Sequence, residues 1–264
     1  MSCRSLHLYA GLLLVLIVVG GVLLSYVWLP FSPDDTSGGR LAPPGGEHLL
    51  GTDKLGRDLF TQLLIGGRIA IGTALGAVTV GGLLGVTAGL LAGFASRWLD
   101  DAVAVVLDIL IAFPTLLLAM LIVAGAGASL ATAVFAIGLA MAAIVARLTR
   151  VLVKQVLSKD YITAARVAGI SWPRIVVDHV LPNIAPTVLV NLALQAGLAV
   201  LAEASLSYLG LGTPPPNASW GRMLFEAQAT VLTAPVAALA PGIALVMLVI
   251  GVNLTADGLR RSVR

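Results

Sequence analysis

One short stretch of the sequence imitates the spacing of a phosphate-binding loop. It runs from Gly51 to Asp58 as GTDKLGRD. A phosphate loop continues from its second glycine with Lys and then Ser or Thr, because the Lys binds phosphate and the hydroxyl binds magnesium. Here Arg57 and Asp58 occupy those two positions, so we expect no nucleotide to bind. We therefore predict that the chain is not an enzyme, that it holds no cofactor, and that any ATP chemistry resides on another chain.

The same stretch contains side chains of the types that bind metal ions. His48, Asp53 and Asp58 lie close together in the sequence. Their spacing fits no standard metal site, and basic residues are interleaved with them. We predict no metal here and expect ion pairs instead. The candidate cations are Lys54, Arg57 and Arg68.

Four polar side chains lie within otherwise apolar runs and are candidate pore-lining residues. Such groups are costly in a membrane and usually face a cavity or a partner. Asp108 could line a gate or make an interhelical contact, and Glu203 could contact substrate or pair with a cation. Asn191 and Gln195 are four residues apart and so share a helix face. They could offer hydrogen bonds to a substrate between the helices or hold neighbouring helices together.

The composition indicates which elements position these residues. Apolar residues make up 58% of the chain and charged residues 11%, compared with about half and a quarter in soluble domains. A helix that crosses a bilayer needs about 20 apolar residues. The first such run lacks a small-residue cleavage site, so we expect it to remain as a span. Six spans are predicted, at 8–29, 69–95, 102–124, 129–149, 184–206 and 232–256.

The basic residues predict the orientation of these spans, because cytoplasmic loops carry an excess of Lys and Arg. With the N-terminus inside, the inner segments carry 11 of the 16 basic residues and the outer segments carry 5. Both termini are therefore expected in the cytoplasm of a multi-pass protein of the cell membrane. The net charge is only +3 and the basic residues are dispersed, so nucleic-acid binding is not expected.

Glycines and prolines predict how the spans pack. Twenty-nine glycines are present. In the second span a glycine recurs at every fourth position, so these glycines share one helix face, where a neighbouring helix can approach closely. That interface could be static or could move. The glycines are Gly81, Gly85, Gly89 and Gly93. Kinks are expected at Pro114, Pro235 and Pro241.

The large inner loop, 150–183, predicts two short helices. Ser158 or Asp160 could cap the first helix, which Gly169 would end in the left-handed conformation. Ser171 could cap the second, with Pro173 in its first turn, and the segment from His179 to Pro182 would close it before the fifth span. Two such helices at a sharp angle would project from the membrane as a rigid elbow. Alone, this pattern fits an ordinary interfacial loop equally well.

The loop resembles the coupling loop of ABC importer permeases. That family carries Glu-Ala-Ala and then a Gly four residues after the second Ala. Here Ala164, Ala165 and Gly169 keep this spacing, but Thr163 replaces the Glu. The departure puts a specific charge contact with the ATPase in doubt, whereas the positions that identify the loop are intact. The resemblance assigns ATPase coupling to the segment 158–182, with Tyr161, Ala164, Ala165, Gly169, His179 and Pro182.

Three further segments resemble the C-type permease of dipeptide, oligopeptide and nickel importers. They are LLGTDKLGRDLFTQLLIGGR at 49–68, EASLSYLGLGTPPPNASWGRML at 203–224 and APGIALVMLVIGVNLTADGLR at 240–260. The resemblance implies an all-α, six-helix permease of the type I ABC importer fold that imports di- or oligopeptides. Nickel or another small solute is the alternative cargo. Outside this class, a proton-coupled secondary transporter or a membrane scaffold remains an alternative.

The resemblance also implies partners and domain limits. A sister permease, two cytoplasmic ATPase subunits that hold ATP and magnesium, and an external substrate-binding protein would complete the importer. We expect a first helix and external loop at 1–68, a permease domain at 69–258 and a cytoplasmic tail at 259–264. In the last outer loop, Trp220 and the prolines at 214–216 could contact the binding protein. Trp220 could instead anchor the chain at the interface.

Overall fold

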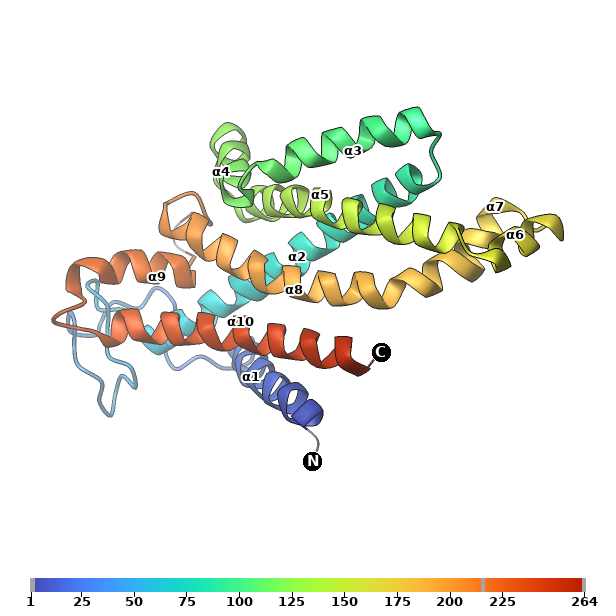
Figure 1. The fold of residues 1–264 in the computed structure, drawn as a ribbon. Coiled ribbons are helices and arrows are strands. Elements are labelled where there is room, and N and C mark those ends of the chain that lie inside the picture. Colours follow the sequence, from blue (N-terminus) through green and yellow to red (C-terminus); the bar gives the residue numbers. More distant parts are fainter. Residues whose placement is uncertain (1–2, 215–216, 263–264) are drawn as a thin grey trace.

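The computed structural model describes residues 3–214 and 217–262, and within them every regular element is a helix (Figure 1). Five helices are long and apolar enough to span a membrane, and a bent pair makes a sixth span. This confirms the predicted six-span, all-α class. The elements are α1 (Cys3–Ser25), α2 (Leu59–Gly93), α3 (Arg97–Ala112), α4 (Thr115–Ala126), α5 (Leu130–Leu157), α6 (Asp160–Val167), α7 (Trp172–Ile175), a π-helical turn (Val176–Val180), α8 (Leu181–Tyr208), α9 (Trp220–Ala227), a 3-10 turn (Gln228–Thr230) and α10 (Val236–Ser262).

The third predicted span, 102–124, is not one helix. It is divided between α3 and α4, whose axes differ by 86°. The break lies at Phe113, which is extended (φ −75°, ψ 131°), because the residue before a proline disfavours the helical conformation. The expected kink at Pro114 is therefore a complete corner.

The other two predicted kinks have different outcomes. Pro235 was expected to bend a helix, but it directly precedes α10 and therefore interrupts nothing. A proline is tolerated at a helix start because the first amide groups lack partners in any case. Pro241 does lie inside α10. Pro186, inside α8, was not singled out from the sequence.

The glycine face of α2 lies against α5. A Cβ added at Gly85 would come within 2.7 Å of the Ala142 carbonyl oxygen, and one at Gly89 within 2.6 Å of the Ala146 oxygen. A Cβ added at Gly81 or Gly93 would lie equally close to atoms of α5. Larger residues would push the two backbones apart, so glycine spacing sets the distance between these helices. Whether the seam moves stays a prediction.

Helix α2 is also longer than its predicted span. It begins at Leu59 rather than at 69 and has 35 residues, which corresponds to about 52 Å. The hydrocarbon core is about 30 Å thick. Its first two turns therefore belong to the end of the molecule that carries the 26–58 segment, and Asp58 caps it by accepting from the Thr61 amide at 2.7 Å.

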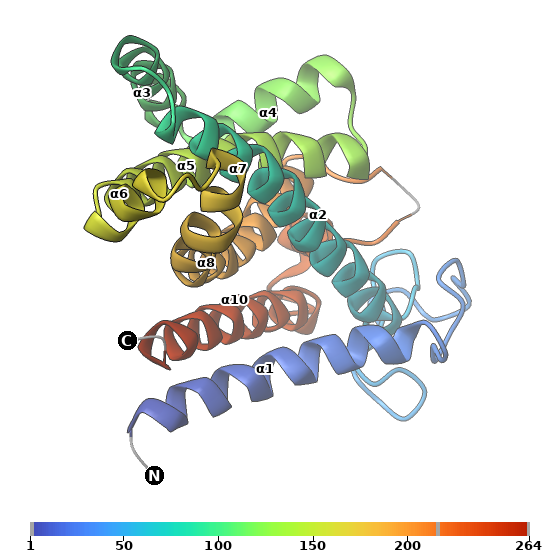
Figure 2. The same ribbon diagram turned by 90° about the vertical axis from the view of Figure 1, so that its right-hand side faces the viewer.

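Helix α1 packs along α10 on the side of the molecule opposite α3 and α4 (Figures 1 and 2). Arg68 of α2 fastens the end of α1, since it donates to Ser25 and lies 4.2 Å from the centre of the Tyr26 ring. The start of α1, the end of α10 and the α6–α7 segment lie at one end of the molecule, and the 26–58 segment lies at the other (Figure 2). We call these the elbow end and the loop end.

Candidate functional site

The α6–α7 elbow owes its sharp turn to Gly169. This residue has φ +81°, a conformation that side chains with a Cβ rarely adopt. Its amide donates to the Arg166 carbonyl, and the Ile170 amide donates to that of Ala165, at 3.0 and 3.1 Å. This paired arrangement is a Schellman motif, which satisfies carbonyls at a helix end. The chain therefore reverses at the residue that the sequence indicated.

The start of the elbow differs from the prediction. Lys159 is the residue that precedes α6, and neither Ser158 nor Asp160 caps the helix through its side chain. The Ser158 hydroxyl instead donates back to the Gln155 carbonyl at 3.0 Å. Ser171 likewise precedes α7 without a side-chain cap, although Pro173 does lie in the first turn.

The second helix of the elbow does not close before the fifth span. It passes from α7 through the π-helical turn Val176–Val180 directly into α8, without a break. The predicted stop between His179 and Pro182 was wrong, because the wider π turn before Pro182 accommodates the proline ring and its missing amide within the continuous helix. A displacement of α7 would therefore be transmitted along the continuous helix to α8.

A small core of its own holds the elbow against the long helices. Ile162, Ile175 and Val180 are fully buried there with Val153 of α5. The ring centres of Tyr161 and His179 are 6.0 Å apart, so these two predicted residues do meet. Ala164 is exposed, but Ala165 is buried. Only the first alanine of the pair is therefore available to a partner, together with Thr163 on the same exposed surface.

The polar residues of α8 do not form one group. Gln195 is buried, and its side chain lines a cavity of about 250 Å³ between α4, α5 and α8. Among the described residues, its amide nitrogen and the Asn191 side-chain oxygen have no hydrogen-bond partner. The cavity is otherwise mostly apolar, with Thr115, Ile137 and Met141 among its lining residues. A polar group without a partner at an opening between helices is costly unless something binds it.

Glu203 lies elsewhere on α8 and is 1% exposed. It was expected to contact substrate or pair with a cation, but in the structure its contact is the Ser207 hydroxyl, which donates to Oε1 at 2.6 Å. Its second oxygen has no hydrogen-bond partner in the part of the chain that the structure describes. Asp108 forms the interhelical contact that was one of its two interpretations, an ion pair with Arg147 of α5 at 3.2 Å. Both side chains of this pair are more than half exposed.

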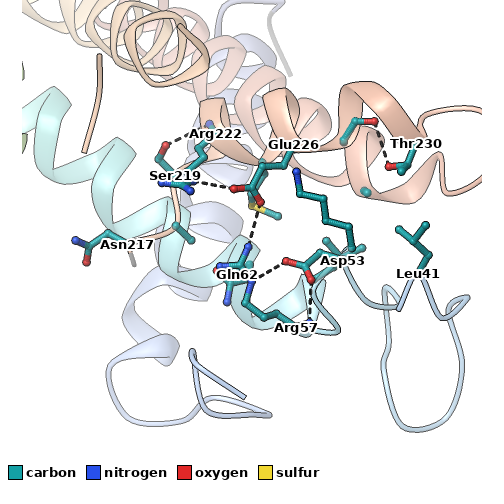
Figure 3. Close-up of a pocket in the computed structure, with 15 residues that line it drawn as sticks. Leu41, Asp53, Arg57, Gln62, Asn217, Ser219, Arg222, Glu226 and Thr230 are labelled. Atoms are coloured by element: carbon teal, nitrogen blue, oxygen red, sulfur yellow. Dashed lines mark hydrogen bonds and ion pairs between the residues drawn. The ribbon is translucent and has the colours of Figure 1, made fainter. Parts of the chain in front are cut away.

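At the loop end, charged residues form a connected network (Figure 3). Arg57 contacts Asp53 at 2.7 Å and Glu226 of α9 at 3.0 Å. Glu226 also accepts from Arg222 at 2.8 Å. The expected ion pairing of this stretch is therefore present through Arg57, whereas Arg68 binds Ser25 instead. The network joins two segments that are 169 residues apart.

The remaining candidates for a metal site are also engaged. His48 contacts Asp58 at 3.0 Å, and Asp58 is the cap of α2. In the part of the chain that the structure describes, no group of three His, Cys, Asp or Glu residues is placed to hold a metal ion.

Trp220 was expected at a surface, either against a partner or at the membrane interface, and both expectations were wrong. It is 2% exposed, and its indole nitrogen donates to the Leu63 carbonyl at 2.8 Å. Gly66 and Gly67 make room for the ring, since a Cβ at either position would lie 2.7 Å and 3.1 Å from it. Trp220 is therefore a core residue that fastens α9 to α2. Pro214 is exposed, and residues 215–216 lie outside the described residues.

One buried ion cluster had no counterpart in the predictions. Asp100 of α3 is 5% exposed and contacts both Arg150, at 2.5 Å, and Lys154 of α5. The two basic residues are four apart, so they share a face of α5. The spacing of Arg150 and Lys154 can be read from the sequence, but their pairing with Asp100, fifty residues before Arg150, cannot.

The chain matches the family described as the inner membrane component of binding-protein-dependent transport systems over residues 85–264. It is 39% identical to the dipeptide transport system permease protein of Alkalihalophilus pseudofirmus, over 84% of this chain and 73% of that protein. It is also 37% identical to the di/tripeptide transport system permease protein of Pseudomonas aeruginosa, over 95% of this chain and 85% of that protein. The nickel transport system permease protein of Escherichia coli K12 is 34% identical to this chain, over 95% of this chain and 91% of that protein. With this extent of similarity and a six-span helical fold, the chain belongs to the family of inner membrane permease components of binding-protein-dependent transport systems.

Proposed function

We propose that this permease forms one half of a peptide-translocating pore and that the α6–α7 elbow couples it to separate ATPase subunits. The observation that carries the coupling role is the continuity of α7 with α8. A force applied to the elbow by ATPase closure would tilt α8 as a rigid body, and rigid-body tilting of packed helices is a known means of switching between two arrangements.

The surface of the elbow supports a protein partner. Val167, at the end of α6, is 85% exposed, and Val177, in the π-helical turn, is 61% exposed. Exposed apolar residues on both arms of a projecting segment are compatible with contact to another protein. The cytoplasmic orientation is part of this proposal and has the support of the basic residues, of which 11 fall on the inner segments.

For the cargo, we propose di- or oligopeptides. Dipeptide, di/tripeptide and nickel permeases are all among the relatives, and the peptide permeases have the higher identity. Gln195 lines the cavity, and its amide nitrogen has no partner among the described residues. Such a donor complements the carbonyl groups of a peptide backbone. A sister permease that covers the cavity at Gln195 would complete the pathway.

The coupling role is tested by replacing Gly169 with Val, with Gly210→Val as a matched control. Both glycines have φ near +80°, both end a helix in a Schellman motif, and a Cβ at either one would meet no neighbour. The substitutions therefore introduce the same backbone strain, about 1–3 kcal/mol, shortly before the start and just after the end of the continuous α7–α8 helix. Peptide uptake and ATP hydrolysis would be measured in vesicles that hold the complete transporter.

We expect Gly169→Val to lower uptake at least tenfold per ATP hydrolysed and to weaken ATPase association. Gly210→Val should leave ATPase association unchanged. Equal effects of the two substitutions on association would overturn the coupling role of the elbow. Transport driven by a proton gradient without any ATPase would establish the secondary-transporter alternative.

A further inference from the structure

Helix α3 lies at the edge of the molecule and packs chiefly on α5 (Figure 1). Of its 16 residues, only Asp100 and Leu107 are buried. Leu107 packs against Ala143 and Ala146 of α5 in a small apolar cluster. Apart from its connections along the chain, α3 is therefore held mainly at two places, one near its start and one near its middle.

The anchor near the start of α3 is ionic. The Asp100 carboxylate contacts the Arg150 guanidinium at 2.5 Å and also the Lys154 ammonium. Because two cations share this carboxylate, the loss of its charge would leave both of them without it. Like charges one turn apart on a helix repel each other, and a buried ion that loses its partner is strongly destabilising. The attachment of the start of α3 therefore depends on Asp100.

A second ion pair joins the same two helices at the middle anchor. Asp108, next to Leu107, contacts Arg147 at 3.2 Å, but both side chains are more than half exposed. Exposed pairs of this kind contribute little, because water competes for the charges. Each of the two carboxylates thus pairs with an arginine of α5, but only Asp100 is buried and lies away from the middle of the helix.

The turn of α5 that holds Asp100 also packs against the elbow. Val153, between Arg150 and Lys154 in the sequence, is buried with Ile162 and Ile175 in the core of the elbow. The start of α3 is therefore fastened to the same turn of α5 on which the elbow rests.

The other end of α3 leads into a wall of the Gln195 cavity. The helix ends at Ala112, and α4 begins at Thr115 after the 86° corner. Thr115 and Leu116, in the first turn of α4, line the cavity together with Gln195. The position of this wall thus depends on the direction in which α3 delivers the chain to the corner.

The spacing of the anchors makes α3 a lever. At 1.5 Å per residue, Leu107 lies about 10 Å along the axis from Asp100 and about 8 Å from Ala112. If the start of α3 were released while Leu107 stayed in place, the two ends of the helix would swing by comparable distances. The corner would move with the end at Ala112.

We propose that Asp100 is a positioning residue for transport, which fixes the α3–α4 corner and thereby the cavity wall that Thr115 and Leu116 form. This role rests on the proposed function of the cavity as part of the peptide pathway. Asp100 does not line the cavity, so it acts through α3 and not by contact with the cargo.

Spin labels on α4 and α2 would report the position of the corner. The labels would be attached to Leu117→Cys and Leu83→Cys, at two exposed positions, after Cys3 has been replaced with Ser. Pulsed electron paramagnetic resonance on the complete transporter in nanodiscs gives the distribution of distances between them. A released α3 samples several positions, so we expect Asp100→Asn to widen this distribution at least twofold. Asp108→Asn, the matched control, should leave it unchanged.

Peptide uptake by the same complex in vesicles measures the consequence for transport. Asp100→Asn should lower uptake per ATP hydrolysed at least fivefold and leave ATPase association unchanged, because the elbow surface is not altered. Asp108→Asn should change uptake less than twofold. Asp100→Glu keeps the carboxylate and should retain more than half of the uptake. If Asp100→Asn fails to assemble, Arg150→Gln, which leaves the contact between Asp100 and Lys154, should widen the distribution and lower uptake to a smaller degree.

An unchanged distance distribution in Asp100→Asn, or unchanged uptake despite a wider distribution, would overturn the proposal. Equal effects of Asp100→Asn and Asp108→Asn would also overturn it, as would the absence of any change in Arg150→Gln. An unaltered transporter that imports no peptide would contradict the proposed function instead. The label distances would still show in that case whether Asp100 holds the corner.

Discussion

The two ends of the molecule differ in how they satisfy their own side chains. At the loop end, Arg57, Asp53 and Glu226 neutralise one another, and Trp220 is enclosed between α9 and α2. At the elbow end, a few buried aliphatic residues hold α6 and α7, while Val167 and Val177 face outward. Apolar side chains are exposed at both ends, since Leu49 and Leu55 at the loop end are 62% and 54% exposed. The difference therefore lies in what holds each end in place, which is an ion network between the 26–58 segment and α9 at the loop end and a small aliphatic core at the elbow.

The largest expected effect is the loss of the Trp220 side chain. Trp220→Ala removes a ring that is 2% exposed, and such large-to-small changes lower stability by about 3–5 kcal/mol. Trp172→Ala is the control at the elbow end, where the ring is 42% exposed and the loss should be smaller, about 2 kcal/mol. Thermal inactivation in detergent measures both. Equal losses would remove the contrast between the two ends.

A smaller effect is expected from the loop-end ion network. Arg57→Gln leaves Asp53 and Glu226 without their shared cation, in a site where all three side chains are 11–17% exposed. Hydrogen bonds to charged groups of this kind contribute about 1.5–3 kcal/mol. Arg174→Gln breaks a pair with side chains 75% and 47% exposed, which should cost about 0.5 kcal/mol or less.

Salt sharpens this second comparison. The exposed pair at Arg174 should lose its small contribution at high ionic strength, whereas the partly buried network at Arg57 should keep most of its own. Urea-dependent unfolding of Arg57→Gln and Arg174→Gln at low and high salt would give the loss of unfolding free energy for each variant. A strong salt dependence of the Arg57 contribution would show that the loop end is solvated after all.

The smallest expected effect on stability belongs to the elbow tip. Val167→Asp changes a side chain that is 85% exposed, so the unfolding free energy should change by about 0.5 kcal/mol or less. Association with the ATPase subunits should nevertheless weaken about tenfold or more, as expected for a residue at the centre of an interface. Leu55→Asp, at the loop end, is the control and is 54% exposed. It should leave ATPase association unchanged.

Local patterns in the sequence predicted much of the candidate site. Gly169 ends α6 as expected, because a left-handed residue at a helix end has few alternatives to glycine. The stop near Pro182 was wrong, since whether a proline ends a helix or starts the next one depends on the path of the chain before it. Trp220 was misplaced for a similar reason. Its burial is due to Gly66 and Gly67, which lie on a distant helix.

The sequence by itself determined that the chain spans a membrane through six apolar segments, which glycines lie on one face of α2, and which residue turns the elbow. These properties depend on hydropathy, on a 3.6-residue period and on the conformational range of single residues. Only the tertiary structure decided that the third span is a corner, that α7 and α8 are one continuous helix, and which charges meet. Those outcomes depend on contacts between residues far apart in the chain, and no local window of sequence contains them.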